Sequence, residues 1–110
     1  MIVRKGVLYF GFFKGMEYTK YSEKELEDNF DDYKLFKNSI PKGDIIRHIE
    51  SLPAAYACMQ SFDIITGKEL SPGLYTDNNF AFPTDFLHYL KDYDIGIPYE
   101  YERYLETILK

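Results

Sequence analysis

The stretch Ile64–Pro98 constrains the fold of this chain more than any other segment, because turn-forming residues divide it at short intervals. Pro72 lacks the amide donor that a sheet needs and Gly73 follows it, so a regular central strand is not expected over Glu69–Tyr75. Asp and Asn tolerate the positive φ angle that a tight hairpin requires. Asp77–Asn79 therefore predicts a hairpin turn.

Phe80–Phe82 is expected to return from this turn as a short strand, and two helices are expected after it. Pro83 suits the first turn of a helix that runs to about Tyr93, because an amide at that position would have no helical partner. The last helix is predicted from Pro98 to the end of the chain. Apolar residues recur at the helical period in both helices: Phe86, Leu87, Leu90 and Tyr93 in the first, and Tyr101, Tyr104, Leu105 and Ile108 in the second.

Three further strand regions are predicted. Ile2–Val3 and Val7–Phe13 are apolar segments separated by Gly6, and they predict two short strands or one bent strand. Met16–Tyr21 alternates weakly between apolar and polar residues, which predicts another strand. Ala54–Ile65 is apolar on both faces at its start, which is typical of a central strand.

Two helices are predicted between these strands. Ser22 and Glu25 have the spacing of a capping box, in which each side chain satisfies the backbone amide of the other residue. The pattern predicts a helix over about Glu23–Lys37, with acids in its first half and bases at its end, as the helix dipole favours. A second helix is predicted over Pro41–Leu52. Together these elements predict one α+β domain over residues 1–110, with a small, mostly antiparallel sheet and about four helices.

The chain is expected to act in the cytoplasm. A domain of 110 residues needs no disulfide or metal to hold its core. Cys58 is the only cysteine, so no intramolecular disulfide can form, which favours a reducing compartment. The N-terminal segment lacks the pattern of a secretory signal. No membrane association is predicted, because the apolar run Val7–Phe13 is too short for a bilayer, which takes roughly 20 residues.

Charge and aromatic content point to a protein partner. The net charge of −5 opposes nucleic-acid binding, which depends on clustered Lys and Arg, and the basic residues of this chain are dispersed. The same charge suits a basic partner, and a merely solvated acidic surface is the alternative explanation. The chain has 11 Tyr, a residue whose large ring and hydrogen-bonding tip suit interfaces.

No catalytic, metal or cofactor site is predicted. His48 and His88 lack the spacing of a metal-binding pair, and Cys58 has no CxxC partner. Gly11 and Gly15 lack the spacing of a phosphate-binding loop. The alternative is a small enzyme in which His48 and His88 act as acid and base, or in which Cys58 pairs with a histidine. That alternative requires the fold to bring those side chains together.

The predicted acidic helix is the candidate partner-binding site. On a helix, Glu27 shares a face with Asp31, and like charges at that spacing repel slightly unless a basic partner neutralises them. Asp28 and Asp32 are related in the same way. A solvated helix face is the alternative. The candidate partner-binding residues, including one at the hairpin tip, are Glu23, Glu27, Asp28, Asp31, Asp32, Tyr33 and Asp77.

The second half of the chain carries a pattern that extends from the hairpin into the helices. The hairpin tip Asp77–Asn79 is followed by aromatic–x–aromatic–proline at Phe80–Pro83. An aromatic-rich helix then covers Phe86–Tyr93, and a short link ends in Ile97–Pro98. This pattern, over Thr76–Tyr101, resembles small bacterial immunity proteins encoded beside polymorphic toxins, including those of contact-dependent growth inhibition systems.

The resemblance implies a cytosolic, non-enzymatic inhibitor that binds one toxin domain and blocks its active site. Many such toxins look like nucleases with basic clefts, and opposite charge raises the rate of encounter. The implied partner is therefore a cognate toxin with a basic active-site cleft. A phage-encoded or other protein-directed inhibitor of host defence is the alternative binding function.

Overall fold

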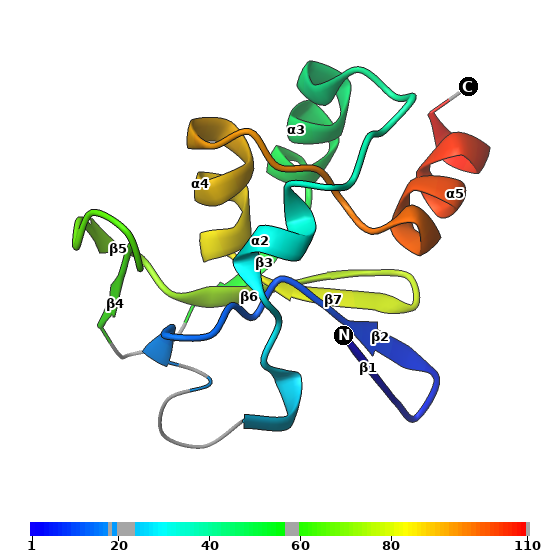
Figure 1. Ribbon diagram of the computed structural model, residues 1–110. Coiled ribbons are helices and arrows are strands. Elements are labelled where there is room, and N and C mark those ends of the chain that lie inside the picture. Colours follow the sequence, from blue (N-terminus) through cyan, green and yellow to red (C-terminus); the bar gives the residue numbers. More distant parts are fainter. Residues whose placement is uncertain (18, 20–23, 57–59, 110) are drawn as a thin grey trace.

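Four α-helices lie over one face of a five-stranded sheet in the computed structural model, which describes residues 1–17, 19, 24–56 and 60–109 (Figure 1). The strands lie in the order β1 (Ile2–Arg4), β2 (Val7–Tyr9), β7 (Phe80–Pro83), β6 (Gly73–Asp77) and β3 (Ala54–Tyr56). Neighbouring strands are antiparallel, except that β2 and β7 are parallel. The predicted α+β class with a mostly antiparallel sheet is confirmed.

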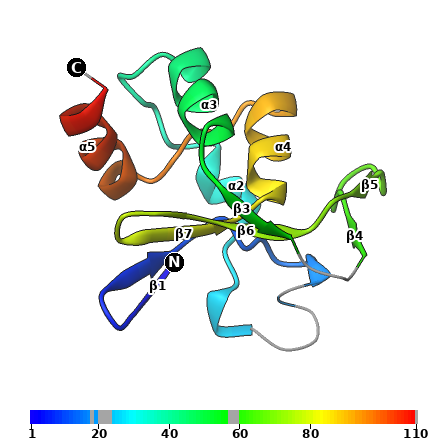
Figure 2. The ribbon, with the colours of Figure 1, turned by 180° about the vertical axis from the view of Figure 1, so that it is seen from behind.

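The helices are gathered on one side of the sheet in both of two opposite views (Figure 1 and Figure 2). They are α2 (Phe30–Tyr33), α3 (Lys42–Glu50), α4 (Asp85–Asp92) and α5 (Tyr99–Ile108), and a short 3-10 helix, η1 (Lys24–Leu26), precedes them. A separate two-stranded hairpin of β4 (Ser61–Phe62) and β5 (Glu69–Leu70) projects beside the sheet. Within the described residues, no helix combines the length and the apolar character that crossing a bilayer requires.

Aromatic rings fill the space between the sheet and the helices. Phe10, which follows β2, stacks on Phe82 of β7 at a centroid distance of 4.8 Å and meets Phe86 of α4 edge-on at 5.3 Å. Tyr101 of α5 packs against Phe10 and Phe82, at 5.3 and 5.4 Å. These four rings are fully buried, and burial of such a side chain stabilises the fold by about 1.5–3 kcal/mol. The sheet is thereby joined to both C-terminal helices.

Gly11 allows the chain to turn beneath α4 directly after β2. Its φ is +79°, and a Cβ at this position would lie 2.7 Å from Cδ1 of Phe86, so only glycine fits without displacement of the ring. The chain then continues into the core, where Phe13 is fully buried. The strand predicted over Val7–Phe13 therefore ends at Tyr9.

The hairpin and three of the helices that local signals predict are confirmed. β6 and β7 form an antiparallel hairpin, and Asn78 at its tip has a positive φ of 52°. Pro72 lies between β5 and β6, so no single strand runs through Glu69–Tyr75. The helices α3, α4 and α5 each begin one or two residues after a proline, as the position of proline in first turns predicts.

The single helix predicted over Glu23–Lys37 is wrong. The described part of this segment contains η1, then an extended segment, then the four-residue α2. The backbone of Asp28 pairs with the chain after β2: its amide donates to the Phe12 carbonyl at 2.8 Å, and its carbonyl accepts from the Lys14 amide at 2.9 Å. A helix at Asp28 would need the same groups, so tertiary contact overrides the helical pattern. Ser22, of the predicted capping box, lies outside the described residues.

Two predicted strands are also wrong. The segment Ala54–Ile65 does not form one central strand: its start is β3, at an edge of the sheet, where Tyr56 is 68% exposed, and its end contributes β4 to the separate hairpin. In Met16–Tyr21, the described Glu17 and Thr19 are helical. Weak alternation of apolar and polar residues predicts a strand only where a partner strand is present to pair with it.

Candidate functional site

The structure divides the predicted partner-binding residues into an exposed and a buried group. Glu27, Asp31 and Asp32 are exposed, and among these three only Asp31 has an ion pair within the described residues, with Lys34 at 2.9 Å. Because the predicted helix is broken, Glu27 and Asp31 do not share a helical face. Glu23 lies outside the described residues. The buried group is Asp28, Tyr33 and Asp77.

Asp28 and Tyr33 join the chain after β2 to α2. The Tyr33 hydroxyl donates to Oδ2 of Asp28 at 2.6 Å and accepts from the Gly11 amide at 2.9 Å. The same amide lies 3.0 Å from Oδ2 of Asp28, and the N-terminal amine of Met1 pairs with Oδ1. Burial and the neighbouring Asp28 raise the pKa of Tyr33 well above its ordinary value. Both side chains are used inside the fold and are not available to a partner.

Asp77, predicted as a partner-facing residue at the hairpin tip, instead joins three elements. Its Oδ2 accepts from the Tyr101 hydroxyl of α5 at 2.7 Å and lies 2.8 Å from Nε2 of His48 on α3. The Tyr104 hydroxyl lies 3.4 Å from Oδ1. Burial and the hydrogen bond to Asp77 raise the pKa of Tyr101. This carboxylate therefore fixes the β6–β7 hairpin to α3 and α5.

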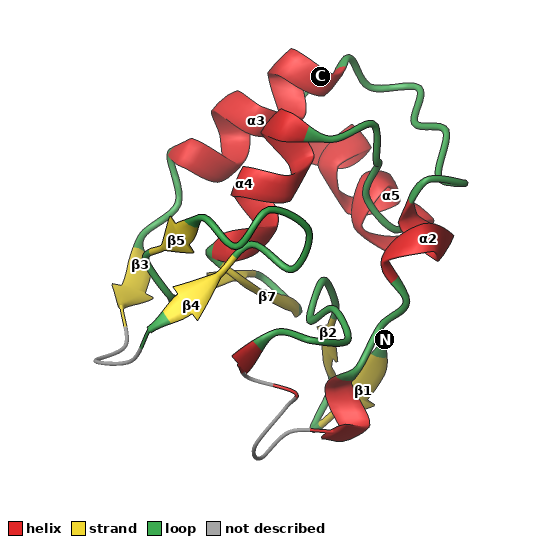
Figure 3. Cartoon of the chain, turned by 60° about the vertical axis from the view of Figure 1, so that its left-hand side comes forward, coloured by secondary structure: helices red, strands yellow, loops and turns green. Residues whose placement is uncertain are grey.

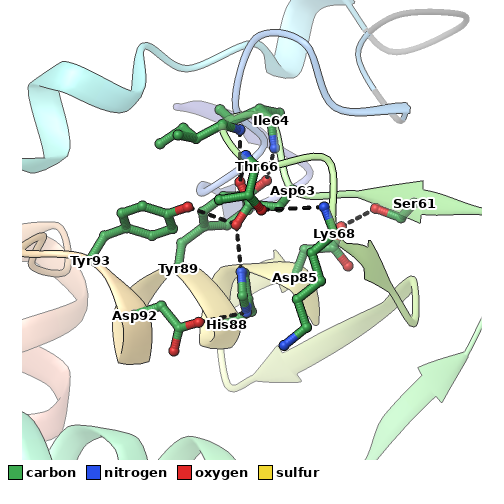
Figure 4. A network of polar contacts seen from close by, with 11 residues as sticks. Ser61, Asp63, Ile64, Thr66, Lys68, Asp85, His88, Tyr89, Asp92 and Tyr93 are labelled. Carbon is green, nitrogen blue, oxygen red and sulfur yellow. Dashed lines mark hydrogen bonds and ion pairs between the residues drawn. The ribbon is translucent and has the colours of Figure 1, made fainter.

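A second histidine–aspartate contact fixes the β4–β5 hairpin to α4 (Figure 4). Asp63, in the turn after β4, is 3% exposed; its Oδ2 lies 2.7 Å from Nε2 of His88 and accepts from the Tyr93 hydroxyl at 2.8 Å. Its Oδ1 accepts from the amides of Ile65 and Thr66. Burial alone would raise the pKa of Asp63, but these four hydrogen bonds lower it to about 2. The carboxylate is therefore ionised at neutral pH.

Asp85, the first residue of α4, is buried beside this network (Figure 4). Ser61 of β4 donates a hydrogen bond to Oδ2 of Asp85, and Oδ1 has no hydrogen-bond partner in the part of the chain that the structure describes. Burial raises the pKa of Asp85, because the charged carboxylate is poorly solvated there. This contact adds a further attachment of the β4–β5 hairpin to α4.

The two histidines belong to different networks. Nε2 of His48 is held by Asp77 and Nε2 of His88 by Asp63, and Asp92 lies 3.4 Å from the other nitrogen of His88. The two imidazoles do not contact each other within the described ranges, and each is held by an aspartate of its own network. The enzymatic alternative stays a prediction. These ranges also contain no group of three or more side chains placed to hold a metal ion. Cys58 lies outside them.

Five carboxylates are buried within the described residues. They are Asp28, Asp63, Asp77, Asp85 and Glu102. Part of the acidity behind the net charge of −5 therefore lies inside the fold, where hydrogen bonds hold it. The exposed Glu27, Asp31 and Asp32 stay candidates for a surface that faces a partner.

Glu102 of α5 illustrates the internal role of these carboxylates. It accepts from the amides of Ser39 and Ile40, at 2.6 and 3.2 Å, and from the side-chain amide of Asn38 at 3.1 Å. The Asn38 side chain in turn accepts from the Ile97 amide at 2.9 Å. The loop between α2 and α3 is thereby closed onto α5.

One exposed apolar pair lies where the chain after α2 meets the start of α5. Leu35 is 71% exposed, the most of any large apolar side chain in the described residues, and Tyr99 is 41% exposed. The Tyr99 hydroxyl lies 3.5 Å from the Leu35 carbonyl oxygen and accepts from the Lys37 amide at 3.2 Å. Asp32 and Glu100 are exposed, each close in sequence to one of the pair, and neither has an ion pair within the described residues. We name these four residues the Leu35–Tyr99 surface.

No local pattern in the sequence predicts this surface. The signal for it was an apolar residue, Leu35, that lies off the apolar stripe of the predicted helix. Tyr99 could not be assigned to it, because the contact between the two residues depends on how α5 packs.

Comparison with known proteins adds no relative. No family model matches the chain, and neither a curated protein nor a solved structure matches it significantly. The resemblance of Thr76–Tyr101 to immunity proteins stays a prediction, and a functional proposal depends mainly on the geometry described above.

Proposed function

We propose that this chain is an immunity protein that acts in the cytosol, where it binds a cognate toxin domain and blocks its basic active-site cleft. A nuclease is the expected class of toxin. The pattern in Thr76–Tyr101 supports the proposal through its resemblance to immunity proteins. Its residues form β7, α4 and the start of α5, which places Tyr99 of the Leu35–Tyr99 surface within the same segment.

The Leu35–Tyr99 surface is the observation that carries the proposal. The histidines and the buried aspartates are occupied by contacts inside the fold, whereas Leu35 and Tyr99 hold large apolar areas in solvent. Tyr99 is held by ring contact with Phe36 at 5.1 Å, and Phe36 packs against the buried Tyr33 at the same distance. Exposed aromatic side chains on a fixed frame are typical of residues that contribute most to protein–protein binding.

A toxin domain, if one is encoded by the gene next to this one, provides a direct test. Co-expression of this chain should protect bacterial cells from that domain, and the purified proteins should bind with a dissociation constant of about 10 nM or tighter. A chain that neither binds nor protects would contradict the proposal. If phage structural genes surround this gene, and no adjacent toxin domain binds, the alternative of an inhibitor of host defence is favoured.

A further inference from the structure

We propose that attachment of the β4–β5 hairpin to α4 is linked to protonation of Asp85, whose buried carboxyl group is neutral while the hairpin is attached and ionises when the hairpin leaves α4. The inference concerns a conformational equilibrium of this hairpin and does not depend on the proposed function. Attachment then takes up one proton from solvent, so that a rise in pH weakens it.

The β4–β5 hairpin pairs with no strand of the five-stranded sheet and lies beside the start of α4 (Figure 3). Two of its contacts with this helix involve a buried carboxyl group. Asp63 of the hairpin faces His88 of α4, and Asp85 of α4 faces Ser61 of the hairpin. Both carboxyl groups therefore become open to water if the hairpin moves away from the helix.

The two carboxyl groups differ in the number of donors that surround them (Figure 4). Four donors face the oxygens of Asp63. Asp85 is 2% exposed; its Oδ2 has the Ser61 hydroxyl, and its Oδ1 has no partner in the described part of the chain. An ionised carboxylate offers about four acceptor positions, and a buried charge without hydrogen bonds is far more costly than a buried neutral group. The unpartnered oxygen therefore favours the neutral form of Asp85.

The other groups around Asp85 do not reverse this preference. Burial is the largest influence and raises the pKa of Asp85 above 3.8, and the Ser61 hydroxyl, the neighbouring His88 and the amide of Asp85 itself lower it by less. Tyr89 of the same helix carries no charge at neutral pH, because burial raises its pKa. Lys68 of the hairpin is exposed and forms no ion pair with Asp85.

The pH dependence of attachment has opposite signs for the two aspartates. The pKa of Asp85 is raised while the hairpin is attached and returns toward 3.8 when water reaches the side chain. The attached form therefore binds more protons, and attachment weakens as the pH rises from 3.8 through the raised pKa. Asp63, with a pKa of about 2, weakens attachment only as the pH falls below 3.8. Asp85 is thus the aspartate that acts in the range above pH 4.

Hydrogen exchange of the Ile64 amide measures attachment directly, because this amide donates to the Tyr89 hydroxyl of α4 at 2.9 Å. In the purified full chain, its protection factor should be compared with that of Asp85→Asn, which is neutral at every pH. The ratio of variant to unmodified chain should rise above pH 4, by as much as about tenfold per pH unit, until the raised pKa is passed. A ratio that does not change with pH would overturn the inference.

Glu69→Gln is the matched control, because it removes one exposed acid of the same hairpin that has no ion pair within the described ranges. Its ratio to the unmodified chain should vary by less than about twofold from pH 4 to pH 8. His88→Gln removes the other titrating group beside Asp85. The fall in protection with rising pH should persist in this variant, and its disappearance would assign the proton to His88 and overturn the inference.

A direct titration decides the case in which Asp85→Asn does not fold. The carboxyl carbon of Asp85, followed by NMR in the unmodified chain, should titrate with a midpoint above the ordinary 3.8. A midpoint at or below that value would show that Asp85 is ionised while the hairpin is attached, and would overturn the inference.

Discussion

Carboxylates that are close in the sequence have different roles in this protein. Asp28 accepts from the Gly11 amide and the Tyr33 hydroxyl and pairs with the N-terminal amine, whereas Asp32 is exposed without an ion pair in the described residues. Their spacing of four residues predicts a shared helical face. The difference between them comes from donors that lie far away in the sequence.

Asp28→Asn should therefore lower the free energy of unfolding much more than Asp32→Asn. An amide at position 28 removes a charge that three internal donors share, at a cost of about 2–4 kcal/mol. Asp32→Asn, at an exposed position, should change the free energy of unfolding by less than about 0.5 kcal/mol. Urea unfolding at pH 7 measures both values, and equal effects would contradict the internal role of Asp28.

Glu102 allows a similar comparison within one helix. Glu102→Ala leaves the Ser39 and Ile40 amides and the Asn38 side chain without their acceptor, and should cost about 2–4 kcal/mol of unfolding free energy. Glu106→Ala, at an exposed position of α5, should change it by less than about 0.5 kcal/mol. A stable Glu102 variant would show that the loop between α2 and α3 does not need this acceptor.

Single side chains hold whole elements in place. The β4–β5 hairpin lies outside the main sheet, and its attachment to α4 includes Asp63 with His88, Ser61 with Asp85, and the Ile64 amide, which donates to the Tyr89 hydroxyl at 2.9 Å. A two-stranded hairpin is marginally stable by itself in water. Its order therefore depends on these contacts with α4.

The Asp63 contacts should make stability depend on pH in the acid range. The pKa of Asp63 is about 2 in the folded chain, against an ordinary value of 3.8, so ionisation of Asp63 stabilises the fold above pH 3.8. This contribution, about 2 kcal/mol, is lost as the pH falls from 3.8 through 2. The unfolding free energy of the unmodified chain should therefore approach that of Asp63→Asn between pH 5 and pH 2. A difference that stays constant over this range would contradict the lowered pKa.

At the scale of the whole molecule, charges buried in the fold still contribute to the electrostatic attraction between this protein and a basic partner. The chain has a net charge of −5, and buried carboxylates that are ionised, such as Asp63, add to the field around the protein. The rate of association with a basic toxin domain should therefore fall about tenfold as ionic strength rises from about 0.01 to 0.5 M. Stopped-flow measurement at several salt concentrations tests this, and a rate that does not change with salt would contradict a basic target.

Substitution of both histidines distinguishes a binding function of the whole protein from an enzymatic one. In the double variant His48→Gln and His88→Gln, donors remain near Asp77 and Asp63, so the chain should lose about 1–3 kcal/mol of stability and still fold. It should protect cells from the toxin as the unmodified chain does. Loss of protection by a folded double variant would favour the enzymatic alternative.

The sequence predicts correctly those elements that are specified by residues close to them along the chain, and fails where distant contacts decide the structure. The β6–β7 hairpin and helices α3, α4 and α5 follow from residues close to their own boundaries, such as Asn78, Pro41 and Pro98. The segment Glu23–Lys37 was mispredicted because the backbone of Asp28 pairs with a chain segment that sequence periodicity does not reveal. For the same reason the sequence does not reveal that Asp28, Tyr33 and Asp77 are buried, since their burial depends on distant partners.

The sequence by itself determined the turns, the proline-initiated helices and the excess of acids over bases, because φ preferences, proline geometry and charge belong to single residues and their neighbours. Only the tertiary structure decided where those acids lie. Asp28, Asp77 and Glu102 find their donors on other elements, and a buried carboxylate is stable only where such donors converge. The same packing left Leu35 and Tyr99 together in solvent, which no local pattern specifies.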